Sequence, residues 1–162
     1  KTGGMVPTFD GGTRGFSKWK DICDDPALSG QVMWTSMKKH GRAFEKLLRV
    51  YGNKPARLLD VTRNLLVFNT MTDLTNCLGI IVTDENVRVE RLKNRMGVHY
   101  DSSETGGYRD VCINLRLMNK EAFALGAELH ICEVQLILKD FADLRSSDGH
   151  KRYVQARNTR GV

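Results

Sequence analysis

Two polar side chains interrupt the apolar stretch "HICEVQLIL" at residues 130–138. The stretch is rich in β-forming residues and predicts a buried strand. Glu133 and Gln135 are two residues apart, so on a strand they point to the same face. A carboxylate and an amide side by side can bind polar groups of a ligand, and a carboxylate can also hold a magnesium ion. Packing alone does not explain why so apolar a strand carries this pair.

Three other predicted strands, 57–68, 87–95 and 108–117, also place polar residues on a common face. In 108–117 the alternation is regular, because Val111, Ile113, Leu115 and Leu117 form the opposite, apolar face. The polar residues that share a face are Asp60, Thr62 and Asn64 in the first strand, Arg91, Lys93 and Arg95 in the second, and Tyr108, Asp110, Cys112, Asn114 and Arg116 in the third.

If these strands pair in one sheet, their polar residues form a surface suited to a nucleotide. Asp60 and Glu133 could hold Mg²⁺, arginine and lysine could bind phosphates, and Tyr108 could stack on a purine. These are the parts that phosphoryl or pyrophosphoryl transfer requires. The alternative is structural: antiparallel sheets often have one solvated face, Asp60 and Arg63 could form an ion pair, and Tyr108 could pack at the start of a strand.

Helices fill much of the chain between these strands. The strongest pattern covers residues 31–51, where Met33, Met37, Phe44, Leu47, Leu48 and Tyr51 follow helical spacing and Lys38, Arg42 and Lys46 lie on the other side. Shorter helices are predicted at 72–79, 118–126 and 139–146, a turn or short helix at 24–31, and a glycine-rich loop at 1–17. The sequence thus predicts an α/β (α+β) fold, with a mixed central β-sheet flanked by helices.

The length of the chain indicates one domain. We expect an intracellular, cytoplasmic protein and not a membrane or secreted one. No apolar run approaches the roughly 18 residues that a membrane-spanning helix needs, and no targeting signal is visible. The four cysteines are far apart, which indicates reduced thiols instead of a zinc site or disulfide scaffold. The net charge of +6 favours anionic partners such as nucleotides or nucleic acid.

Short motifs in a fixed order resemble the RelA/SpoT-like synthetase family, which moves pyrophosphate from ATP to the 3′-hydroxyl of a guanine nucleotide. The motifs are "KKHGRAFEK", "RLLDVTR", "RLKNR", "GYRDVCIN", "EVQL" and "GHKRY". They resemble, in turn, the family's basic donor-binding helix, its first strand, and its R-x-K-D, G-Y-x-S-x-H, E-x-Q and H-x-x-Y segments. The resemblance implies a synthetase domain over residues 31–157, preceded by an N-terminal extension (1–30) and followed by a truncated continuation (158–162).

The resemblance also implies roles for individual residues. Asp60 and Glu133 would be the catalytic and Mg²⁺-binding pair, with Glu133 activating the attacking hydroxyl and Tyr108 stacking on the acceptor base. The expected nucleotide-binding residues are Lys38, Arg42, Lys46, Arg63, Arg91, Lys93, Tyr108, Gln135 and His150. The chain departs from the family motifs at Asn94, Asp110, Cys112 and Ile137, and the segment between "RLKNR" and "GYRD" is longer than usual.

Three functions are compatible with these features. The first is a divergent pyrophosphokinase or nucleotidyltransferase that uses ATP and Mg²⁺, with a purine nucleotide or an RNA end as acceptor. The second is a non-catalytic module of the same fold, bound to other protein subunits in a larger assembly, which the substituted motif positions favour. The third is a nucleic-acid binder that uses the basic helix and a basic tail of Lys151, Arg152, Arg157 and Arg160.

Overall fold

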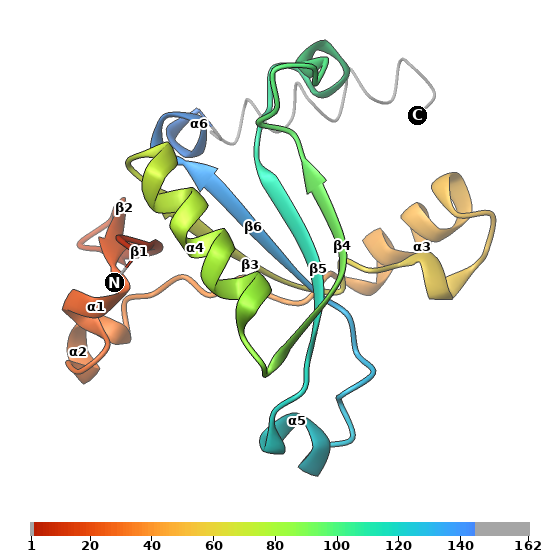
Figure 1. The fold of residues 1–162 in the computed structure, drawn as a ribbon, viewed down its shortest axis with the longest axis horizontal. Helices are drawn as coiled ribbons and strands as arrows, with labels where there is room; N and C mark the ends of the chain where they lie inside the picture. Colours follow the sequence, from red (N-terminus) through yellow and green to blue (C-terminus); the bar gives the residue numbers. More distant parts are fainter. Residues whose placement is uncertain (1, 145–162) are drawn as a thin grey trace.

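The chain forms a six-stranded mixed sheet with the strand order β2-β1-β3-β6-β5-β4 (Figure 1). The computed structural model describes residues 2–144 of the chain. Neighbouring strands are antiparallel except for β3 and β6, which are parallel. The strands are β1 (Met5–Asp10), β2 (Thr13–Lys18), β3 (Thr62–Phe68), β4 (Val87–Asn94), β5 (Val111–Leu117) and β6 (Cys132–Leu138). The mixed sheet with flanking helices confirms the predicted fold class.

The helices are short apart from two. They are α1 (Trp19–Ile22), α2 (Pro26–Ser29), α3 (His40–Val50), α4 (Met71–Thr83), α5 (Lys120–Ala124) and α6 (Lys139–Asp143), with 3₁₀ turns η1 (Pro55–Arg57) and η2 (Ser102–Thr105). Helix α4 begins at the N-cap Thr70, whose side chain accepts from the Asp73 amide. It lies across one face of the sheet (Figure 1).

The main core lies between α4 and that face of the sheet. Leu74 from α4 packs with Phe68, Ile113 and Leu136, and each of these side chains is at most 1% exposed. The period-2 pattern of β5 is confirmed, because Val111, Ile113 and Leu115 all belong to this cluster. On the opposite face a smaller cluster joins Val67, Ile137 and Met5 to Ala142 of α6. That smaller cluster leaves most of the opposite face available for polar residues.

The predicted loop at residues 1–17 is wrong, because this segment forms the β1–β2 hairpin. Gly11 and Gly12 make the turn with φ of 53° and 89°, values that favour glycine. Met5 and Val6 are buried, and Met5 pairs with Val67 of β3. The glycines that suggested a loop therefore mark a tight hairpin connection.

The predicted helix at 31–51 is too long at its start, since α3 covers only His40–Val50. Residues before it run extended: the Met33 amide donates to the Pro7 carbonyl at 2.8 Å, and the Lys38 amide donates to the Val61 carbonyl at 3.0 Å. These bonds to neighbouring chain segments replace the helical ones. The methionines that fitted a helical period are exposed instead, with Met37 70% accessible.

The other predicted elements are found with shifted ends. β3, β5 and β6 each begin three to five residues later than expected, while α4 extends beyond 72–79 at both ends. Within the part of the chain that the structure describes, no helix has the length and apolar character needed to cross a membrane.

Candidate functional site

The face of the sheet opposite α4 carries aligned rows of polar side chains, called here the polar face. In one row Arg63 of β3 pairs with Glu133 of β6, Glu133 with Asn114 of β5, and Asn114 with Arg91 of β4. The next row contains Leu65, Gln135, Cys112 and Lys93. Side chains at paired positions lie on the same side of a sheet, so four strands contribute to one surface.

Glu133 and Gln135 lie together on the polar face, as their spacing predicted. The Gln135 Nε2 atom donates to Glu133 Oε1 at 3.0 Å. The opposite side of β6 is apolar, since Cys132, Val134 and Leu138 pack against the α4 cluster. Gln135 therefore fixes the orientation of the Glu133 carboxylate, which is the only acid in these two rows.

The prediction that Thr62 and Asn64 belong to the polar face is wrong. Asn64 pairs with Val134, whose side chain packs against the α4 cluster, so Asn64 lies on the α4 side. Leu66 has the same parity and packs there too. Burial of the apolar residues of β3 against α4 sets this orientation and turns Arg63 toward Glu133.

Asp60 precedes β3 by two residues and forms an ion cluster with two lysines, called here the Asp60 cluster. The ammonium groups of Lys38 and Lys46 both donate to Asp60 Oδ2, the latter at 2.8 Å. Asp60 Oδ1 is buried and has no hydrogen-bond partner. The cluster fastens α3 and the segment before it to the start of β3.

The electrostatics of the Asp60 cluster balance burial against charge pairing. Burial by itself favours the neutral acid, but the hydrogen bonds from Lys38 and Lys46 outweigh it and hold the pKa of Asp60 below its usual value. For Lys46, burial favours the neutral amine, yet the bond to Asp60 raises its pKa. All three groups therefore stay charged at neutral pH, with two positive charges against one negative charge.

Arg42 lies away from this cluster on the exposed side of α3. Its Nη1 atom donates to Glu45 Oε2 at 2.7 Å, and its side chain is 59% exposed. Arg91 and Lys93 on the edge strand β4 are also exposed. Their nucleotide-binding roles stay predictions, as do those of the other residues named from the sequence. His150 lies outside the described residues, as does the whole "GHKRY" motif.

Tyr108 is held by a buried ion pair at one end of the polar face. Arg95 Nε and Nη2 donate to the two oxygens of Asp110 at 2.7 and 2.8 Å, and Tyr108 Oη donates to Asp110 Oδ2 at 2.8 Å. The Arg95 guanidinium lies 5.6 Å from the Tyr108 ring centroid. Burial disfavours the charged guanidinium, but pairing with Asp110 raises the pKa of Arg95. The ring is thus oriented, with a cation near it.

Cys112 stands on the polar face between the Tyr108 network and Glu133. Its pKa is raised to about 12 by burial first, and then by the negative charge of Glu133 and Asp110. The thiol is therefore neutral at physiological pH and is a weak nucleophile. A small, uncharged side chain therefore lies in this part of the polar face.

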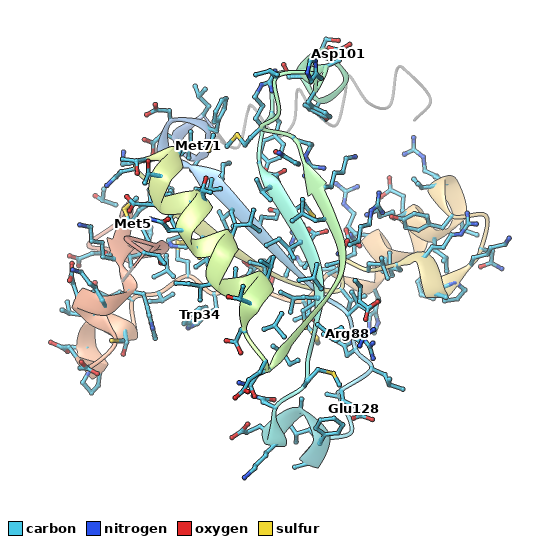
Figure 2. All side chains as sticks on the ribbon, in the orientation of Figure 1. Met5, Trp34, Met71, Arg88, Asp101 and Glu128 are labelled. Atoms are coloured by element: carbon cyan, nitrogen blue, oxygen red, sulfur yellow. The ribbon has the colours of Figure 1, made fainter. Side chains whose placement is uncertain are left out.

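Arg109 fastens the long segment between β4 and β5. Its guanidinium donates to the carbonyls of Arg95, Gly97 and Tyr100 at 3.1–3.2 Å. Figure 2 labels Asp101 in this segment, beyond the end of the sheet opposite to Arg88. The Asp101 side chain caps η2 by accepting from the Ser103 amide at 2.9 Å. These contacts hold the segment between β4 and β5 in place beside Tyr108.

The sequence did not single out Arg95, Asp110, Asn114 or Arg109 as site residues. Asn114 is 5% exposed, and its Nδ2 atom is a buried donor without a partner. The alternation of 108–117 places Asp110 and Asn114 on the polar face, but only the strand register brings Asn114 opposite Glu133. Nothing in the local sequence around Arg109 indicates its carbonyl contacts.

The carboxylates of Asp60 and Glu133 have the chemistry to bind a magnesium ion that arrives together with phosphates. Asp60 and Glu133 would each supply oxygen ligands; in the structure Asp60 contacts Lys38 and Lys46, whereas Glu133 contacts Gln135. Asp60 Oδ1 is a buried acceptor without a hydrogen-bond partner. Mg²⁺ commonly binds through one or two carboxylates, with water and substrate phosphates completing its shell. Among residues 2–144, no group of three or more His, Cys, Asp or Glu residues could hold a metal ion.

The fold is similar to that of solved alarmone synthetases. The small alarmone synthetase 1 from Bacillus subtilis, bound to its product pppGpp, superposes with a TM-score of 0.55 and 16% identity, over 71% of this chain and 59% of that one. A GTP pyrophosphokinase family protein from Streptococcus pneumoniae gives 0.59 and 15%, over 84% and 68%. The small alarmone synthetase 2 from Bacillus subtilis gives 0.55 and 16%, over 86% and 73%.

These comparisons concern the fold. The chain spans 59% of the length of the pppGpp-bound structure. No family model matches the sequence, and no curated protein does. The chain nevertheless has the RelA/SpoT-like synthetase fold, in agreement with the motif order in its sequence.

Proposed function

We propose that this chain, which has the RelA/SpoT-like synthetase fold, is a pyrophosphokinase that moves pyrophosphate from ATP to a hydroxyl group. The acceptor is a purine nucleotide or an RNA 3′-end. The observation that carries the proposal is the row in which Arg63, Glu133, Asn114 and Arg91 pair across four strands. This row combines one proton acceptor with two phosphate-binding cations on a single surface.

In the proposed reaction, the acceptor oxygen attacks the β-phosphorus of ATP. The new bond is O–Pβ, the bond from Pβ to the α,β-bridging oxygen breaks, and AMP leaves. Glu133, oriented by Gln135, accepts the hydroxyl proton. Arg63, Arg91 and Lys93 bind phosphate oxygens, and Tyr108 stacks against the acceptor base. Asp60 and Glu133 would hold a magnesium ion, which would neutralise charge on the phosphates.

Several substituted positions favour a second candidate, a non-catalytic module that retains the nucleotide site. Cys112 is a neutral thiol. Asp110 is buried and accepts hydrogen bonds from both Arg95 and Tyr108. Both positions depart from the family motif. Such a module would bind nucleotides, or dock on protein subunits, without turnover.

One variant separates the two candidates. Glu133→Gln is nearly isosteric and removes the proton acceptor, so we expect unchanged thermal melting and a loss of turnover of about 100 to 10,000-fold. The assay is transfer of label from β-labelled ATP to a panel of purine nucleotides and RNA ends. Glu85→Gln, an exposed residue between α4 and β4, is the matched control.

The outcomes assign the function. Full activity of Glu133→Gln would refute the proton-accepting role. Binding of ATP with Mg²⁺ by calorimetry, without transfer to any acceptor, would favour the non-catalytic module. Absence of heat with every purine nucleotide would remove nucleotide binding from both candidates.

A further inference from the structure

We propose that the Asp60 cluster couples metal binding to polyphosphate binding: Lys38 and Lys46 keep Asp60 closed to a divalent cation until a polyphosphate draws the two ammonium groups away. This inference rests on the proposed function, because it concerns the order in which the ligands of that site bind. It assigns the lysines a second task besides contacting phosphate.

Two positive charges are crowded at one oxygen of Asp60. Both ammonium groups bond to Asp60 Oδ2, and the side chains of Lys38 and Asp60 are each only 13% exposed. A divalent cation that coordinated Oδ2 would lie within a few ångströms of two positive charges in a partly desolvated site. Repulsion at such distances is only weakly reduced by the surrounding protein. The free protein therefore opposes metal binding at Asp60.

The other oxygen of the same carboxylate is enclosed by protein. Asp60 Oδ1 is buried and accepts no hydrogen bond, although a buried carboxylate oxygen normally has a partner. A hydrated cation has no access to this atom while the cluster is closed. The carboxylate thus has one oxygen occupied by lysines and one that is enclosed and unsatisfied. When the lysines leave, Oδ2 becomes available as a ligand.

A polyphosphate has the chemistry to open the cluster. Its several negative oxygens compete with Asp60 for the ammonium groups, and the long lysine side chains can follow them. Lys46 lies on α3, and Lys38 lies two residues before the start of that helix, so both belong to one chain segment. The same phosphate oxygens supply ligands to a cation that keeps few protein ligands. Each ligand then raises the affinity for the other by the same factor.

The experiment uses Mn²⁺ as a paramagnetic probe and measures its affinity by water proton relaxation. This relaxation distinguishes protein-bound ion from ion bound only to nucleotide. For the unmodified chain we expect Mn²⁺ alone to bind at least tenfold more weakly than Mn²⁺ with a non-hydrolysable ATP analogue or inorganic tripolyphosphate. Lys38→Met and Lys46→Met keep the aliphatic stem and remove one charge. Each should bind Mn²⁺ alone at least tenfold more tightly and lose most of the coupling.

Two controls test whether the effect belongs to the cluster. Lys120→Met changes a lysine on α5, and it should behave as the unmodified chain. Asp60→Asn should lose the coupled Mn²⁺ binding. Thermal melting of every variant checks that the fold is kept, and each single lysine variant retains one ammonium group on Asp60.

The metal-only measurements separate this inference from the proposed function. Tighter Mn²⁺ binding by the lysine variants supports the closed cluster even if no ATP analogue binds. Equal Mn²⁺ affinity with and without polyphosphate in the unmodified chain would overturn the coupling while leaving pyrophosphate transfer possible. Failure of both lysine variants to gain affinity, or absence of Mn²⁺ binding in all samples, would also overturn it.

Discussion

At the scale of single residues, Asp110 combines complete burial with a full set of partners. It is 0% exposed and pairs through both oxygens with Arg95, while Tyr108 donates to it as well. Such a group contributes little net stability compared with an apolar residue of the same size. Its removal is costly, because the partner cation is then left buried without compensation.

We therefore expect Asp110→Ala to lower the free energy of unfolding by about 3 to 5 kcal/mol, the usual cost of breaking a buried pair. Urea unfolding monitored by tryptophan fluorescence measures the loss. Glu90→Ala breaks the more exposed contact with Arg116, 2.6 Å long, and should cost no more than about 1 kcal/mol. Equal losses in the two variants would contradict the importance assigned to burial.

Cys112 gives a second prediction at this scale. Its pKa of about 12 leaves roughly one thiol in ten thousand ionised at pH 8, and the thiolate is the reactive form. Because the shift is upward, the thiol is neutral throughout the physiological range and ionises only as the pH approaches that value. Iodoacetamide at pH 8 should therefore spare Cys112 in the folded protein.

Mass spectrometry after timed alkylation checks this prediction. Cys23 is only partly buried and should react first, and unfolding in urea should make Cys112 react as well. Rapid alkylation of Cys112 in the folded chain would mean that the environment described for it is wrong.

At the scale of elements, α4 is the helix that covers the core. Leu74 is 1% exposed within the cluster between α4 and the sheet, whereas Ile80 of the same helix is 52% exposed. We expect Leu74→Ala to lower the free energy of unfolding by about 2 to 5 kcal/mol through lost burial and a residual cavity. Ile80→Ala is the control with a smaller cost, below about 1 kcal/mol, since solvent already reaches it.

Denaturation curves of both variants measure these losses. A similar cost at the two positions would show that α4 does not cover the sheet in the described orientation.

The alternation of apolar residues allowed most of the strand faces to be predicted from the sequence. It placed Glu133 with Gln135 correctly, because parity within a strand is a local property. It failed for Thr62 and Asn64, since both faces of β3 carry polar residues near its start. Only packing against α4 determines which of the two faces is buried. It also missed the β1–β2 hairpin, which non-local pairing of Met5 with Val67 attaches to the sheet.

The same limit applies to α3 and to the candidate site. Met33 and Met37 fitted a helix, but the carbonyls of Pro7 and Val61 take the backbone amides of Met33 and Lys38. Those partners are distant in sequence, so local spacing cannot reveal them. Likewise, the sequence suggested Lys38, Lys46 and Asp60 individually, whereas their joint ion cluster depends on how the chain returns to the start of β3.

At the scale of the whole molecule, the order of the strands is what assembles the polar face. β3 and β6 are adjacent at the centre of the sheet, with β1 and β2 on one side and β5 and β4 on the other. The row from Arg63 to Arg91 crosses from β3 to β4 without interruption. Pairing of β3 with β6 is therefore required for Arg63 and Glu133 to meet.

That central pairing has a consequence for how the chain folds. Thr62 pairs with Cys132, 70 positions later in the chain, whereas Asn94 pairs with Val111 after only 17. Closing the longer loop costs about 1.2 kcal/mol more by the logarithmic dependence on loop length. We expect the β4–β5 pair to form before the β3–β6 pair, and pulsed hydrogen exchange during refolding should protect the amides of β5 facing β4 first. Simultaneous protection of β3 would contradict this order.

A folding chain would then hold Arg91, Asn114 and Lys93 in place while Arg63 is still apart from Glu133. The two halves of the polar face belong to different stages of folding, and the later stage completes the surface. If nucleotide binds to the polar face as proposed, nucleotide added during refolding should have no effect on the early β4–β5 step and should stabilise only the last one. The polar face is therefore complete only after two parallel strands meet that are separated by about half of the described chain.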